Sequence, residues 1–72
     1  MVNINKLKAK MVESGINAEN LSKEIGIDKA TFYRRLADDG ETFSIREADA
    51  ICRILNLSAN DVNAIFFSQF VA

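Results

Sequence analysis

One short pattern recurs five times along this chain, and it constrains the fold more than any other feature. In each copy an apolar residue precedes a short polar residue, and a second apolar residue follows four positions after the polar one. This is the spacing of a helix start, where the polar side chain accepts a hydrogen bond from an unpaired N–H and the apolar pair packs together. The polar residues are Asn3, Asn17, Asp28, Ser44 and Ser58. The sequence therefore predicts five helices.

The predicted helix ends come from glycine. Gly15, Gly26 and Gly40 follow the first, second and third predicted helices, and glycine tolerates the left-handed backbone that ends helices. The fourth start is weaker because its second apolar residue is Ala48, but Glu47 completes a capping box with Ser44. The predicted helices span about 3–14, 17–25, 28–37, 44–56 and 58–68.

Composition agrees with a single all-α domain over residues 1–72. The chain has 72 residues, no proline and three glycines, whereas strand-rich domains of this size need more turn residues. Apolar residues recur at helical spacing and are expected to form the core. They are Ile4, Leu7, Met11, Leu21, Ile25, Phe32, Leu36, Ile45, Ala48, Ile51, Cys52, Leu55, Val62, Ile65, Phe66 and Phe70.

Several classes of function are disfavoured. The lone Cys52 can form no intramolecular disulfide, and the chain has no histidine to activate a thiolate. The sequence has no glycine-rich phosphate loop and no metal-ligand cluster, and the acidic residues around Gly40 lack EF-hand spacing. No apolar run is long enough to span a membrane, and the N-terminus is not signal-like. We expect a cytoplasmic protein that is not an enzyme and uses no metal or cofactor.

Charge is distributed unevenly between the two halves of the chain. Residues 1–36 carry seven basic and four acidic side chains, a net charge of +3, whereas residues 37–72 carry two and six, a net charge of −4. Such asymmetry indicates that one surface meets a polyanion, although solvated helix faces can produce it too. The overall net charge of −1 argues against loose DNA binding driven by charge alone.

The stretch NLSKEIGIDKATFYRRL carries the most specific signal. Leu21 and Ile25 are the apolar residues of one helix, Gly26 lies in a tight turn, Asp28 caps the next helix and Phe32 anchors it. Two helices that cross at a large angle through about three residues need this arrangement. The stretch resembles the helix-turn-helix of the phage repressor and Cro type, the XRE family. The resemblance implies a compact five-helix fold like that of lambda repressor, with the motif at about residues 17–36.

The resemblance covers most of the chain and includes three departures. Ser22 stands where alanine is common, Ala18 where a phosphate-binding glutamine is common, and Arg35 where an apolar residue is usual. The closing segment ILNLSANDVNAIFFSQFVA is similar to the ends of small phage-borne regulators of this class.

The resemblance also implies which side chains touch double-stranded DNA. With Phe32 and Leu36 inward, the opposite face of the third helix carries Lys29, Ala30, Tyr33 and Arg34, which match the positions that read base edges in the major groove. Arg34 or Lys29 could bind guanine, and Ala30 could contact a thymine methyl. Tyr33 could bond a phosphate or pack on a base edge, or be a partly buried packing residue. Thr31 and Arg35 are expected to contact the backbone or solvent, and Asn17 to contact a phosphate.

These features predict a sequence-specific transcriptional regulator, from a phage or prophage, in the bacterial cytoplasm or nucleoid. A small helical protein-interaction module, like an antitoxin or anti-repressor partner that keeps the fold without DNA binding, is the alternative. The apolar C-terminal segment AIFFSQFVA predicts a weak homodimer. Phe67 and Phe70 could instead cover the domain's own core.

Overall fold

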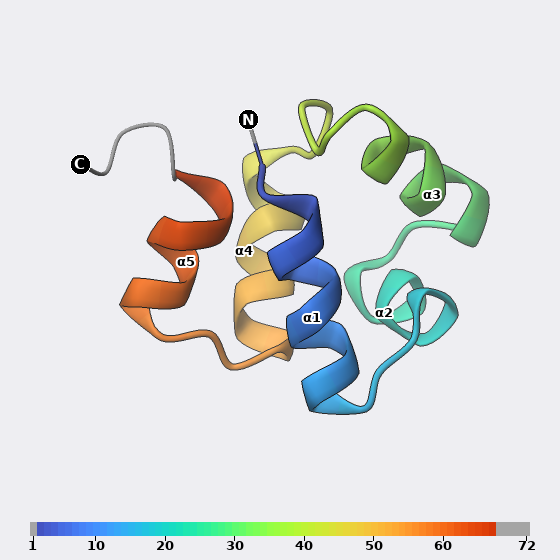
Figure 1. The fold of residues 1–72 in the computed structure, drawn as a ribbon. Coiled ribbons are helices and arrows are strands. Elements are labelled where there is room, and N and C mark those ends of the chain that lie inside the picture. Colours follow the sequence, from blue (N-terminus) through green and yellow to red (C-terminus); the bar gives the residue numbers. More distant parts are fainter. Residues whose placement is uncertain (1, 68–72) are drawn as a thin grey trace.

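The computed structural model describes residues 2–67, which form five α-helices and no strand (Figure 1). The longest dimension of the molecule is 34 Å. These findings confirm the predicted all-α fold with five helices. The helices are α1 (Ile4–Ser14), α2 (Ala18–Ile25), α3 (Lys29–Ala37), α4 (Ile45–Ile54) and α5 (Ala59–Phe66).

All five predicted helix starts are confirmed by their capping hydrogen bonds. In each one, the side-chain oxygen of the cap accepts from the backbone N–H three residues later, at distances from 2.7 Å for Asp28 to 3.1 Å for Asn3. Ser44 and Glu47 form the expected capping box. Ser58 and Asp61 form a second capping box, which was not predicted. The caps are Asn3, Asn17, Asp28, Ser44 and Ser58.

The predicted helix ends are only partly right. Gly15 and Gly26 do adopt the left-handed backbone at the ends of α1 and α2. After α3, however, the first left-handed residue is Asp39, with φ of 57°, and Gly40 follows it. After α4, Asn56 adopts the same left-handed backbone conformation, with φ of 52°. Aspartate and asparagine tolerate this backbone better than other non-glycine residues do. The positions of glycine therefore predicted only some of the helix ends.

The core contains most of the residues that helical spacing predicted. Leu7, Leu21, Phe32, Ile51 and Ile65 are fully buried, and Phe32 also packs its ring against Phe43 at a centroid distance of 5.8 Å. Phe32 thus ties the helix pair α2–α3 to the loop that leads into α4. Ile4, Leu36, Ala48, Val62 and Phe66 are half-buried. Phe70 lies outside the described residues.

Two core predictions need correction. Ile45 is 91% exposed, because it is the first residue of α4 and the buried side of that helix begins only with Glu47 and Ile51. Cys52 is half-buried rather than buried, and it faces an apolar groove between α4 and α5. Desolvation and the nearby charge of Asp49 both raise the pKa of its thiol.

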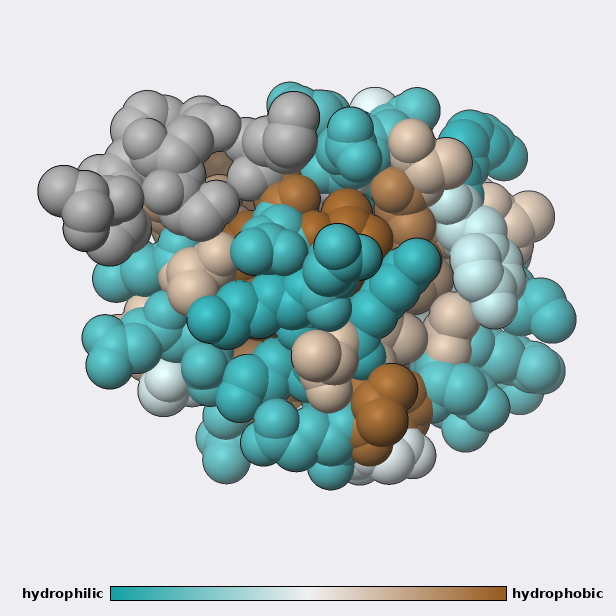
Figure 2. Space-filling model, viewed as in Figure 1, coloured by the Kyte–Doolittle hydropathy of each residue, from teal (hydrophilic) through white to brown (hydrophobic). Residues whose placement is uncertain are grey.

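The helices are arranged so that α2 packs on both α3 and α4, while α1 packs on α5. In Figure 1, α2 and α3 lie together at one side, and α5 lies at the other. Lys10 of α1 bonds Asp61 of α5 at 3.2 Å, and this hydrogen bond raises the pKa of Lys10 and lowers that of Asp61. Figure 2 shows hydrophilic residues over most of the face that carries α1, with hydrophobic surface in small patches.

Candidate nucleic-acid interface

The turn between α2 and α3 sets the direction of α3. Gly26, with φ of 84°, donates its N–H to the last turn of α2, and the Ile27 N–H bonds the Ser22 carbonyl at 3.0 Å. Ile27 then packs against the core and Asp28 caps α3. Buried Ser22, which stands where alanine is common, satisfies its hydroxyl by donating to the Glu19 carbonyl at 2.8 Å. The two helices are therefore joined through a short turn that the N–H groups of Gly26 and Ile27 tie to the end of α2.

One face of α3 is exposed, as the sequence predicted. Phe32 points into the core at 0% exposure, whereas Tyr33 is 53% exposed, and Lys29, Ala30 and Arg34 are also exposed. Residues four apart stack on a helix surface, so Lys29 lies above Tyr33 and Ala30 above Arg34. The structure thus brings the four predicted base-reading residues together in two adjacent columns. Thr31 is half-buried, and its backbone N–H bonds the Asp28 carboxylate at 2.7 Å.

Charge on this face is only partly compensated within the protein. The hydrogen bonds from Thr31 hold the pKa of Asp28 below its usual value, and the positive charge of Arg34 lowers it further. Lys29 Nζ lies 3.9 Å from Glu19 Oε2, with both side chains more than half exposed. Such a solvated ion pair is weak and is readily exchanged for another anion.

Asn17 lies at the N-terminus of α2, where it is exposed. Its side-chain oxygen accepts from the Asn20 N–H at 2.8 Å, so the oxygen serves as the helix cap and the side-chain amide remains as a donor. Free N–H groups and the helix dipole favour an anion at such a position.

Tyr33 and Asn17 also line a shallow apolar hollow between α1 and α3, together with Leu36.

A comparison with protein families identifies the family to which this domain belongs. The family model for the Cro/C1-type HTH DNA-binding domain matches residues 6–66. The chain belongs to the Cro/C1-type helix-turn-helix family. No curated protein and no solved structure matches it at a significant level. The family match confirms the resemblance drawn from the motif and supports a DNA-binding regulator that takes double-stranded DNA as partner.

Within this Cro/C1-type domain, Arg35 lies in a different environment from the one that its sequence position predicted. It was expected to contact the DNA backbone or solvent. The structure instead places its Nε 2.9 Å from Glu47 Oε1 of α4, and its Nη2 donates to Glu47 Oε2 at 3.2 Å. The Arg35 side chain is 26% exposed and that of Glu47 only 8%. The guanidinium thus already has an internal anionic partner.

Glu47 is the functional candidate that sequence reasoning missed. Burial alone would raise the pKa of its carboxyl, but the Ser44 N–H and the Arg35 guanidinium outweigh that effect and hold the pKa below its usual value. The available signal was an arginine at a usually apolar position of α3 together with the capping glutamate of α4. Nothing in the sequence showed that these two side chains meet.

Two further observations bear on other classes of function. Members of the Cro/C1-type family are typically not enzymes, and residues 2–67 bring together no group of three or more histidine, cysteine or carboxylate side chains suited to a metal ion. Over the same range, every helix is too short or too polar to cross a bilayer.

Proposed function

We propose that this protein is a sequence-specific regulator of transcription that reads the major groove of double-stranded DNA through the exposed face of α3. The observation that carries the proposal is the fixed rotation of this helix: the Asp28 cap and the buried Phe32 leave Lys29, Ala30, Tyr33 and Arg34 outward. Arg34 offers a guanine its bidentate donors, Lys29 a single cation, and Ala30 a small apolar contact for a thymine methyl. Asn17 and Thr31 are assigned to the phosphate backbone.

The protein is further proposed to act as a repressor in a phage or prophage, in the host cytoplasm. The likeness of its closing segment to the ends of small phage-borne regulators supports the phage origin. The acidic second half of the chain, with its net charge of −4, supports binding that depends on register rather than on charge alone.

Replacement of Arg34 tests the reading face. We expect Arg34→Ala to weaken binding to the selected site by about 1–3 kcal/mol, because a bidentate base contact contributes that much discrimination. The site is first selected from a random duplex pool with the wild-type protein. Affinity for that site and for random duplex is then measured by fluorescence anisotropy across a salt series, in which phosphate contacts appear as a steep fall of log affinity with log salt.

Arg53→Ala is the matched control for Arg34→Ala. Arg53 lies on α4, is 72% exposed and pairs with Asp49, so its loss changes the net charge equally without touching α3. Equal loss of site affinity in both variants would contradict a base contact by Arg34. Failure of the wild-type protein to bind any duplex at low salt would favour the protein-interaction alternative.

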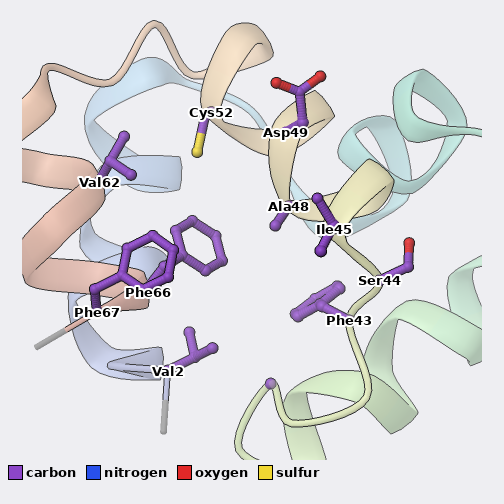
Figure 3. Close-up of a pocket in the computed structure, with 11 residues that line it drawn as sticks. Val2, Phe43, Ser44, Ile45, Ala48, Asp49, Cys52, Val62, Phe66 and Phe67 are labelled. Atoms are coloured by element: carbon purple, nitrogen blue, oxygen red, sulfur yellow. The ribbon is translucent and has the colours of Figure 1, made fainter. Parts of the chain in front are cut away.

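We also propose that two copies bind together as a weak homodimer through the C-terminal apolar segment, of which residues 68–72 lie outside the described residues, and the adjoining groove between α4 and α5, which Phe66 and Phe67 of that segment line. The groove has a volume of about 460 Å³, and its lining includes the exposed Ile45 and Phe67 as well as Val2, Phe43, Ala48, Val62 and Phe66 (Figure 3). Proteins with this motif commonly occupy half-sites about 34 Å apart as dimers. Because the longest dimension of a protomer is 34 Å, two protomers can lie on half-sites at this separation without overlapping.

Ile45→Gln tests this dimer without changing charge. Because Ile45 is 91% exposed, the substitution leaves the core intact but removes apolar surface from the proposed interface. We expect the dimer dissociation constant, measured by sedimentation equilibrium, to rise about 70-fold, because the loss of about 50 Å² of apolar contact from each of the two copies corresponds to about 2.5 kcal/mol. Val12→Gln is the control, since Val12 is 81% exposed on α1 and lies outside this groove. Identical self-association of both variants and the wild type would rule the surface out.

A further inference from the structure

The ion pair between Arg35 and Glu47 joins the C-terminal half of α3 to the first turn of α4. Glu47 Oε1 accepts the Ser44 N–H at 3.0 Å and lies 2.9 Å from Arg35 Nε, while Oε2 accepts from Arg35 Nη2 at 3.2 Å. In return, Ser44 Oγ accepts the Glu47 N–H at 3.0 Å. One carboxylate therefore closes the capping box of α4 and holds the guanidinium of α3.

This contact is directional in a way that an apolar contact is not. The hydrophobic effect that would hold a leucine or methionine at position 35 is non-directional, so such a side chain would be oriented by shape complementarity alone. Arg35 Nη2 donates a hydrogen bond to Glu47 Oε2, while its buried Nε lies 2.9 Å from Oε1 without hydrogen-bond alignment, so one charge-assisted hydrogen bond and one close charged contact define the approach of the guanidinium. Since the Glu47 side chain is only 8% exposed and its carboxylate also accepts a hydrogen bond from the Ser44 N–H, the carboxylate cannot follow the arginine outward.

The pair therefore acts on the end of α3 that the turn does not control. Gly26 and the Asp28 cap fix the first turn of α3, whereas Arg34 lies in its second half, directly before Arg35. Any rotation of α3 at Arg35 would carry the Arg34 side chain around the helix axis with it. Bidentate recognition of a base tolerates little such movement.

We propose that Arg35 and Glu47 are positioning residues that hold the C-terminal half of α3 in the rotation begun by Asp28 and Phe32, and so determine how sharply the protein distinguishes its site from other DNA. This inference rests on the proposed reading of DNA by α3. It also reassigns Arg35: in the bound state its charge stays with Glu47 and does not count among the phosphate contacts.

Arg35→Lys is the decisive variant, because it keeps the charge and removes the planar fork. We expect the ratio of affinities for the selected site and for random duplex to fall about tenfold, the size of one bidentate base contact. Affinity for random duplex and its salt dependence should stay unchanged. A role confined to stability predicts another result, since partial unfolding lowers both affinities by the same factor and leaves their ratio intact.

Arg53→Lys is the matched control, because Arg53 makes an exposed ion pair with Asp49 at 3.1 Å on α4. This variant should keep the wild-type ratio. Circular dichroism and thermal unfolding report whether each variant is folded under the binding conditions.

Glu47→Gln provides a second, independent measurement. The amide oxygen can still accept the Ser44 N–H, but the loss of charge frees Arg35 for a phosphate. We expect tighter binding to random duplex, with the slope of log affinity against log salt steeper by about 0.9, one phosphate contact. An unchanged slope, or an unchanged ratio in Arg35→Lys, would overturn the positioning role while leaving the proposed function standing. Absence of any duplex binding by the wild type would overturn both.

Discussion

Phe32→Ala is expected to destabilise the domain by about 3–5 kcal/mol, the range measured for buried phenylalanines. Phe32 is 0% exposed, and its ring meets that of Phe43 at 5.8 Å, so the substitution leaves a void between α3 and the α3–α4 loop. A small domain has a total stability near the lower end of about 5–15 kcal/mol. The variant should therefore lose most of its free energy of unfolding, and its thermal midpoint should fall by at least about 12 °C.

The neighbouring Tyr33→Ala is the control for this experiment. It removes an aromatic ring of similar size from the same helix, but from a position that is 53% exposed. Its effect on stability should stay within about 1 kcal/mol, since surface substitutions seldom exceed that. Thermal and urea unfolding followed by circular dichroism measure both variants. Similar losses from Phe32→Ala and Tyr33→Ala would mean that the inward and outward faces of α3 are wrongly assigned.

Gly40→Ala is expected to be the second most damaging change. Gly40 has φ of 74°, and a Cβ added there would lie 2.6 Å from Val2 Cβ and 2.7 Å from Val2 Cγ2. The left-handed backbone costs about 1–2 kcal/mol for alanine, and overpacking adds about 1–3 kcal/mol. Val2 cannot move freely, because its N–H donates to the Asp39 carbonyl. The N–H of the adjacent Asn3 also donates to the Ile65 carbonyl, at 2.7 Å. Urea unfolding should show a combined loss of about 3 kcal/mol.

Gly15→Ala separates these two causes. Gly15 has nearly the same φ, 69°, but no atom within 4 Å of an added Cβ, so only the backbone cost of about 1–2 kcal/mol should appear. A double-mutant cycle with Val2→Gly gives the second check, because removal of the Val2 side chain should relieve the clash in Gly40→Ala. Equal losses at Gly15 and Gly40, with no coupling to Val2, would refute the close approach.

The reading face of α3 was predictable because its signals are local. A cap at Asp28 and a large apolar residue at Phe32 define the phase of one helix, and Lys29, Ala30, Tyr33 and Arg34 then follow by counting at 100° per residue. The exposure of these residues agrees with that prediction. Their contacts with DNA remain proposals that the variants above test.

Arg35 shows where such counting fails. Helical phase places it between the buried and exposed faces, where either solvent or phosphate would be a reasonable partner. Its actual partner, Glu47, is 12 residues away and belongs to another helix. The prediction that Ile45 belongs to the core was wrong for a related reason. Its spacing matches the apolar stripe of α4, but it lies in the first turn of the helix, outside the core.

The local pattern of caps and apolar pairs was sufficient to establish five helices, the turn at Gly26 and the outward face of α3, because each depends on residues within a few positions of one another. Packing between helices decided the rest: the Arg35–Glu47 pair, the contact of Val2 with Gly40 and the groove between α4 and α5. These features join residues that are distant in sequence, so their energies depend on how the helices pack. No periodic pattern in the sequence predicts such contacts.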